Sequence, residues 1–151
     1  MMKRKSVNQW RSAFNAAGLR LTRQRLLICR ELEGRCDHPD VERLYRAVKP
    51  RLSQISVFTV YRTMNALESA GLALRVATWR GHARYDANME THGHFLCEKC
   101  GRIEDVAAQE ACRGLTDHAR DCVKGLVRRV DMMIVGVCEA CLAAPVLRQE
   151  A

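Results

Sequence analysis

The sequence lacks any apolar stretch long enough to cross a membrane. A membrane-spanning helix needs about 20 consecutive apolar residues, and no run within the 151 residues approaches that length. The N-terminus, Met-Met-Lys-Arg-Lys, leads into an amphipathic segment and lacks the apolar core of a secretory signal peptide. These absences favour a cytoplasmic protein with no membrane partner.

Because no export signal is found, the eight cysteines are not expected to form the disulfide framework of a secreted protein. Two Cys-x-x-Cys pairs, Cys97/Cys100 and Cys138/Cys141, have the spacing of zinc ligands. Four thiolates make a closed tetrahedral site, so we predict a structural zinc; a redox disulfide pair is the alternative. The remaining cysteines have no such spacing, and the sequence assigns them no role beyond small apolar residues: Cys29, Cys36, Cys112 and Cys122.

Acidic residues are scarce in the first part of the chain. Residues 1–90 hold 17 Lys and Arg against 8 Asp and Glu, a balance of +9, whereas residues 91–151 hold 8 against 9, a balance of −1. The N-terminal part is therefore the candidate surface for a polyanion such as nucleic acid. A solvated basic face without a partner is the alternative that charge alone leaves open.

Apolar periodicity predicts four helices followed by a hairpin in this basic part. The expected boundaries are a first helix ending at Gly18, a second from the N-cap Thr22 to Gly34, a third with Pro39 in its first turn that ends before Pro50, and a fourth from Ser56 to Gly71 with Val57, Val60, Met64 and Leu67 facing inward. Segments 73–79 and 83–86, joined by residues 80–82, are expected to pair as strands. This order is typical of a winged helix-turn-helix domain, with a helical bundle as the alternative.

In a winged helix-turn-helix domain the last helix enters the major groove of DNA. The outward face of the fourth predicted helix carries hydroxyl, phenol and guanidinium groups, which suit base edges and phosphates. The residues on or beside this face are Ser56, Phe58, Thr59, Tyr61, Arg62 and Asn65.

The 37 residues between the two Cys-x-x-Cys pairs exceed the spacing of a simple zinc ribbon. This segment is predicted to form a strand over 102–106, a helix over about 109–124 and a strand over 126–135. A zinc ion would then clip the last strand to the first.

Two histidines precede the first cysteine pair. One zinc could take His92 and His94 together with Cys97 and Cys100. If the four cysteines share one zinc instead, the two histidines can bind a second ion. On a strand their spacing of two places both side chains on the same face. Candidate carboxylates are Asp86 and Asp105, with His38 as a further candidate, and such nitrogen and oxygen ligands suit Fe(II), Mn(II) or zinc.

With these motifs the chain closely resembles the ferric uptake regulator (Fur) family of metal-dependent repressors, from about residue 10 to residue 142. The matching segments include Ser56-Val-Phe-Thr-Val-Tyr-Arg62 and His92-Gly-His-Phe-Leu-Cys-Glu-Lys-Cys-Gly101, together with segments 17–25, 38–39, 70–72, 84–86 and 136–141. The resemblance implies an α+β fold with a winged helix-turn-helix DNA-binding domain over 1–87, a hinge over 88–91 and an α/β dimerisation domain over 92–151. It also implies a homodimer bound to a palindromic double-stranded operator.

Residue roles follow from the same resemblance, position by position. The four cysteines match the family's structural zinc site. The regulatory Fe(II) or Mn(II) site would use His38, Asp86, His92, His94 and Asp105, which come from both domains. Tyr61 and Arg62 match residues of the recognition helix, and Arg20 matches a basic residue that reaches the minor groove.

Peroxide-responsive repressors (PerR) resemble the chain more than other family members do, because they pair three histidines with two aspartates. Iron-sensing members usually have glutamate at the position of Asp105, and their further metal site would fall on Thr91, Gly93 and Val130, none of which is a good ligand. Zinc-sensing members usually have a cysteine near Ala87, which this chain lacks.

The resemblance therefore implies a repressor whose bound iron reacts with hydrogen peroxide and oxidises His38 or His92, whereas Mn(II) supports repression without that reaction. We expect no catalytic residues and no small-molecule substrate apart from the metal ion and hydrogen peroxide. The alternatives are an iron-responsive repressor, a metal-dependent hydrolase, which would need an open metal position and a general base, and a zinc-stabilised DNA-binding protein without sensing.

Overall fold

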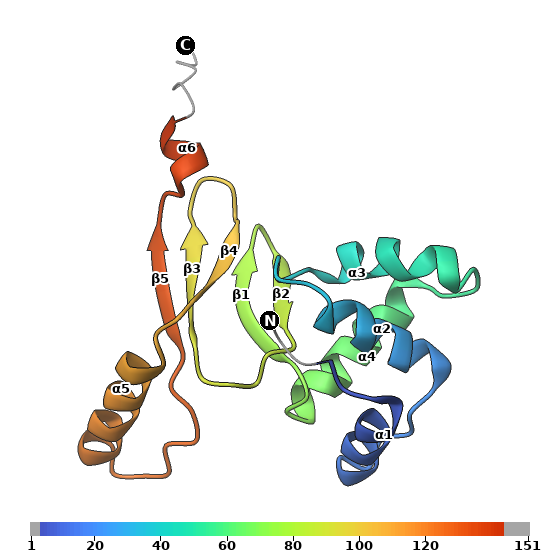
Figure 1. Ribbon diagram of the computed structural model, residues 1–151, viewed down its shortest axis with the longest axis horizontal. Helices are drawn as coiled ribbons and strands as arrows, with labels where there is room; N and C mark the ends of the chain where they lie inside the picture. Colours follow the sequence, from blue (N-terminus) through green and yellow to red (C-terminus); the bar gives the residue numbers. More distant parts are fainter. Residues whose placement is uncertain (1–3, 144–151) are drawn as a thin grey trace. The chain divides into compact units, whose positions relative to one another are not determined.

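The computed structural model describes residues 4–143 and mixes helices with two small sheets (Figure 1). The chain divides into two compact units, one that ends at Glu90 and one that begins at Thr91. Within the described residues, no helix is both long and apolar enough to cross a membrane. The mixed α+β fold class predicted from the sequence is confirmed.

The first unit contains the predicted helices and hairpin. Its elements are α1 (Val7–Ala16), α2 (Arg23–Glu33), α3 (Val41–Val48), the 3-10 helix η1 (Lys49–Arg51), α4 (Val57–Ser69), β1 (Leu74–Trp79) and β2 (His82–Asp86) (Figure 1). Helices α2, α3 and α4 pack against one another, and α2 and α3 also contact β2.

Hydrogen bonds at the helix starts explain where the helices begin. The Thr22 hydroxyl accepts from the Arg25 N–H at 3.3 Å, and the Ser56 hydroxyl accepts from the Thr59 N–H at 3.1 Å, which confirms both predicted N-caps. The prediction that Pro39 lies in the first turn of α3 is wrong. Asp40 caps that helix by accepting from the Arg43 N–H at 2.8 Å, so Pro39 lies before it.

One apolar cluster holds the first unit together. It contains Trp10, Phe14, Ile28, Cys29, Leu32, Leu44, Val48, Ile55, Val60, Met64, Leu67, Ala73, Tyr85 and Ala87. Val57 was predicted to face inward but is 43% exposed. As the first residue of α4 it precedes the turns that pack against α2 and α3.

Strands β1 and β2 pair antiparallel through a two-residue turn. Arg80 and Gly81 have φ angles of 47° and 81°, and positive φ at both central residues is the mark of a type I′ hairpin turn. His82 was predicted to be part of the connecting loop, but it is the first residue of β2 and pairs with Trp79.

The second unit contains β3 (Gly93–Cys97), β4 (Ile103–Val106), α5 (Gln109–Cys122), β5 (Met132–Gly136) and α6 (Glu139–Ala143). Its sheet has the order β4-β3-β5, with β4 antiparallel and β5 parallel to β3. The last strand was predicted to begin at residue 126 but begins at Met132, because its register pairs Met132 with Gly93 at the start of β3.

Candidate metal centres and nucleic-acid interface

The four predicted zinc ligands converge in the second unit. Cys97 ends β3 and Cys100 follows in a turn closed by a hydrogen bond from the Gly101 N–H to the Cys97 carbonyl at 2.8 Å. Cys138 lies directly before α6 and Cys141 lies within it. The four sulfur atoms all lie within 4.8 Å of one another. The parallel pairing of β3 and β5 brings the two turns together.

The spacing of the sulfurs fits a zinc ion. Two sulfurs at about 2.3 Å from a tetrahedral zinc lie about 3.8 Å apart, and the Cys100 and Cys138 sulfurs are 3.8 Å apart. All eight cysteines are free thiols, so the disulfide alternative has no support in the structure. Four soft sulfur donors with no oxygen or nitrogen among them suit a closed structural zinc site.

Backbone N–H groups prepare one sulfur of this cluster for a cation. The Cys138 N–H donates to the Cys97 sulfur at 3.3 Å, and together with the N–H groups of Cys100 and Lys99 it lowers the pKa of Cys97 to about 6. Hydrogen bonds with the Cys100 and Cys138 sulfurs raise the pKa of Cys141 to about 12, because they favour its protonated form. A metal ion would replace these thiol protons, since zinc binds thiolates.

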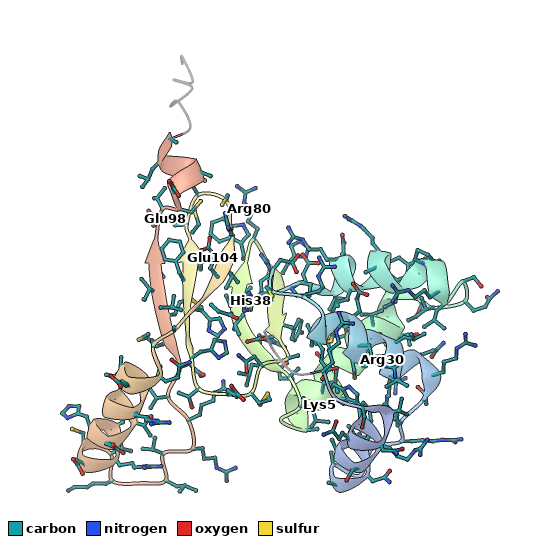
Figure 2. The ribbon with its side chains drawn as sticks, in the orientation of Figure 1. Lys5, Arg30, His38, Arg80, Glu98 and Glu104 are labelled. Atoms are coloured by element: carbon teal, nitrogen blue, oxygen red, sulfur yellow. The ribbon has the colours of Figure 1, made fainter. Side chains whose placement is uncertain are left out.

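Two of the predicted regulatory ligands meet in the first unit. His38 lies on the loop before α3 (Figure 2), and Asp86 ends β2. The His38 Nε2 and an Asp86 carboxylate oxygen are 3.8 Å apart, and both residues are buried. The other carboxylate oxygen accepts from the Asn88 N–H at 2.8 Å.

The other three predicted regulatory ligands meet in the second unit. His94 on β3 and Asp105 on β4 are cross-strand partners, and His92 lies one residue before β3. The Asp105 oxygen is 3.6 Å from the His92 Nε2 and 4.0 Å from the His94 Nε2. Two atoms bound to one cation at about 2.0–2.2 Å each lie about 3–4 Å apart, so this spacing suits a shared ion.

The neighbouring carboxylate on β4 is engaged elsewhere. Glu104 (Figure 2) forms an ion pair with Arg102 at 2.6 Å. Along a strand alternate residues face opposite sides, so Glu104 and Asp105 face apart. The histidine pair is therefore matched with Asp105 and not with Glu104.

The candidate DNA-binding residues divide between two places in the first unit. Ser56 caps α4 and Thr59 lies in its first turn, with their hydroxyls 2.9 Å apart. Tyr61 and Arg62 are exposed one turn later, but Tyr61 points away from Thr59, because residues two apart on a helix do not share a face. Arg20 lies apart, in the exposed connection before α2, and its carbonyl accepts from the Arg25 guanidinium at 2.8 Å.

Phe58 was predicted to lie on the outward face of the fourth helix, but it was not among the predicted DNA-binding residues. Its side chain is 65% exposed, and the Arg62 guanidinium lies 5.9 Å from its ring centroid. An aromatic ring that supports an arginine limits the conformations of that arginine. The signal was present in the sequence, since an apolar residue stood on an otherwise polar face.

Large apolar side chains are exposed along the second unit. They are Leu115, Val123, Leu126, Ile134, Val135 and Leu142, each between 44% and 79% exposed. Strand β5 is moreover an edge strand of its sheet. Exposed apolar groups beside an open strand edge mark an interaction surface.

Comparisons with known proteins agree with this arrangement. A model of the Ferric uptake regulator family matches residues 16–122. The chain is 32% identical over 132 residues to the peroxide-responsive repressor PerR of Staphylococcus epidermidis, which covers 86% of each chain. The structure resembles that of the Campylobacter jejuni peroxide stress regulator with a TM-score of 0.71 and 27% identity, covering 91% of this chain and 100% of that one. The Helicobacter pylori ferric uptake regulator Fur has the same fold, with a TM-score of 0.76 and 23% identity over 95% of this chain and 99% of that one.

Members of this family are transcriptional regulators and not enzymes, so the hydrolase alternative falls away. They bind DNA as dimers and depend on metal ions, in agreement with the two ligand sets and the exposed apolar surface of the second unit. The chain therefore belongs to the ferric uptake regulator family and is a metal-dependent, DNA-binding repressor.

Proposed function

We propose that the protein represses transcription as a homodimer in the cytoplasm and releases its operator when peroxide oxidises a histidine of its regulatory metal site. The first unit (1–87) would read palindromic double-stranded DNA, residues 88–91 would act as a hinge, and residues 92–151 would form the dimerisation domain. Cys97, Cys100, Cys138 and Cys141 would hold structural zinc.

The regulatory ion, Fe(II) or Mn(II), would be held by His38 and Asp86 of the first unit and by His92, His94 and Asp105 of the second. The composition of this donor set carries the proposal. It offers three imidazoles and two carboxylates without sulfur, which suits Fe(II) and Mn(II) better than a thiolate set does. Similarity to peroxide-responsive repressors supports the same function.

The donor set is divided between the two units. The first unit offers two ligands and the second three, so an ion would gain all five only from both units together. An ion that takes ligands from both units favours the arrangement in which they come together. This arrangement would present α4 of the two subunits to the operator, with Ser56, Thr59, Tyr61 and Arg62 as the contacting residues and Arg20 towards the minor groove.

Fe(II) held by these residues would supply the redox chemistry that activates hydrogen peroxide, with peroxide as the net oxidant. The net change at the protein is insertion of one oxygen atom into an imidazole C–H bond of His38 or His92, while the second peroxide oxygen leaves as water. An oxidised imidazole is a poorer nitrogen donor, so the ion and the closed arrangement are lost together. Mn(II), held by the same ligands, would support DNA binding without this oxidation.

The test compares iron-loaded and manganese-loaded protein. A duplex is first selected from a random library with the manganese form, and its binding by both forms is then measured before and after low peroxide under reducing conditions. We expect the iron form alone to lose DNA binding and to gain one oxygen atom on His38 or His92, detected by peptide mass spectrometry. Unchanged binding in both forms would favour an iron-responsive repressor, and equal loss without histidine oxidation would indicate thiol oxidation at the zinc site.

A further inference from the structure

The backbone of His38 has an unusual conformation. Its φ angle is 47°, and among the residues that the structure describes only Arg80, in the hairpin turn, is another non-glycine residue with positive φ. A side chain with a Cβ disfavours this left-handed region. Such a conformation persists only when its surroundings hold it, so the contacts of this loop identify what holds His38.

Three successive carbonyls of the loop are held by two residues of β2. The Arg84 guanidinium donates from Nε to the His38 carbonyl and from Nη2 to the Asp37 carbonyl, the latter at 2.6 Å. The Tyr85 N–H donates to the Pro39 carbonyl at 3.1 Å. The same short segment of β2 thus fixes the backbone on both sides of the His38 side chain.

Arg84 is buried, with only 5% of its surface exposed. Burial lowers the pKa of Arg84 from the ordinary arginine value, and the nearby Asp40 and Asp37 act in the opposite direction. The Asp37 carboxylate binds Arg35 instead, at 2.6 and 2.7 Å. The guanidinium is therefore placed where its planar fork of donors can reach two peptide carbonyls at once, a geometry that a lysine ammonium does not reproduce.

A buried positive charge beside His38 and Asp86 would repel a cation bound there. We therefore ask what other contribution Arg84 makes to this part of the chain. Alternate residues of a strand lie on the same side, so Arg84 and Asp86 both face the His38 loop. Arg84 fixes the loop backbone, and the Asp86 carboxylate lies 3.8 Å from the His38 Nε2.

We propose that Arg84 is a positioning residue for the regulatory metal: its guanidinium clamps the 37–38 backbone and thereby holds the His38 imidazole in the orientation that binds the ion. This inference rests on the proposed regulatory site. The charge of Arg84 should weaken metal binding, whereas its hold on the loop backbone should strengthen it. Whether a substitution raises or lowers metal affinity therefore shows which effect is larger.

The experiment uses zinc-loaded, full-length protein and Mn(II) as the probe. Arg84→Lys keeps the charge and loses the fork, whereas Arg84→Gln loses both. We expect both variants to bind Mn(II) about 10- to 100-fold more weakly, as is typical when a partner that orients a metal ligand is removed. The Co(II)-substituted variants should also show a changed visible absorption spectrum, which reports ligand geometry directly. If charge alone mattered, Arg84→Lys would match the wild type and Arg84→Gln would bind more tightly, and this result would overturn the clamp.

The matched control is Arg46→Gln. Arg46 is exposed on α3, and its guanidinium binds Glu42 at 2.8 Å. Mn(II) affinity should be unchanged in this variant. His38→Ala tests the site itself: wild-type affinity in His38→Ala would refute the regulatory site, whereas a loss there with wild-type affinity in both Arg84 variants would refute only the clamp.

A measurement on the unmodified protein covers the case in which the Arg84 variants do not fold. By NMR, the Arg84 Nε–H should exchange with solvent far more slowly than that of an exposed arginine such as Arg46, because it is buried and bonded to the His38 carbonyl. Exchange at the rate of exposed arginines would show that the clamp does not exist in solution.

Discussion

Replacing Cys100 with serine should unfold the second unit and leave the first unit folded. Among residues 91–143, Ile103 is the only large apolar side chain that is fully buried. The other buried apolar residues are Cys97, Cys112 and Cys138. Burying one isoleucine contributes about 1.5–3 kcal/mol, whereas a structural zinc contributes about 10–16 kcal/mol. The metal would thus contribute more than any single buried side chain of this unit, and a serine hydroxyl is a poor substitute for a thiolate.

The two tryptophans make the test selective, because Trp10 and Trp79 both lie in the first unit. Cys100→Ser should lose zinc and dimerisation, measured by metal analysis and gel filtration, while the denaturant midpoint from tryptophan fluorescence stays near that of the wild type. Cys122→Ser, which changes an exposed cysteine of the same unit, is the control and should keep both zinc and dimer. A Cys100→Ser protein that keeps zinc and stays dimeric would refute the assignment of the site.

Further predictions concern sensing, thiol reactivity and DNA binding. Asp105→Glu should keep Mn(II)-dependent DNA binding but reduce histidine oxidation of the iron form by peroxide, followed by mass spectrometry; unchanged oxidation would remove Asp105 as the feature that separates the two kinds of sensor. Iodoacetamide at pH 8 should modify exposed Cys36 and spare Cys29, because burial raises the pKa of Cys29 to about 12 and keeps its thiol protonated; equal labelling would contradict the packing of α2. Dialysis against a chelator that removes only the weaker metal should abolish DNA binding while zinc remains, whereas retained binding would indicate a constitutive DNA-binding protein. Arg62→Ala should weaken binding of the selected duplex by about 1–3 kcal/mol per lost base contact, while Arg46→Ala, on α3 and paired with Glu42, should not.

Local features of the fold could be predicted from the sequence because they depend on neighbouring residues. The caps at Thr22 and Ser56 use side chains that accept from an N–H three residues further on. The same reasoning failed at Pro39, because Asp40 is the N-cap of α3 and Pro39 therefore precedes the helix. The start of β5 failed for a different reason, since its register is set by pairing with Gly93, far away in the sequence.

The ligand sets show the same division between local and distant information. The Cys-x-x-Cys spacing and the alternation of His92 and His94 can be read directly, because each places its side chains within one turn or strand. The role of Arg84 could not be read, although its motif was noted. Its partners lie 46 and 47 residues earlier in the chain, and arginine in a strand ordinarily faces solvent.

The two sets of candidate metal ligands differ in chemistry: four thiols for the structural zinc, and imidazoles with carboxylates for the proposed regulatory ion. The four cysteines lie within one unit, so zinc binding there would be coupled to the folding of that unit alone. In the proposed regulatory site, by contrast, the first unit supplies only His38 and Asp86. A two-ligand set gains affinity for an ion mainly through preorganisation, and loss of orientation at His38 would leave Asp86 nearly alone. The left-handed backbone at His38 and the buried Arg84 that holds it therefore occur in the half of the site that can least tolerate a misplaced ligand, and that half includes β2 of the hairpin.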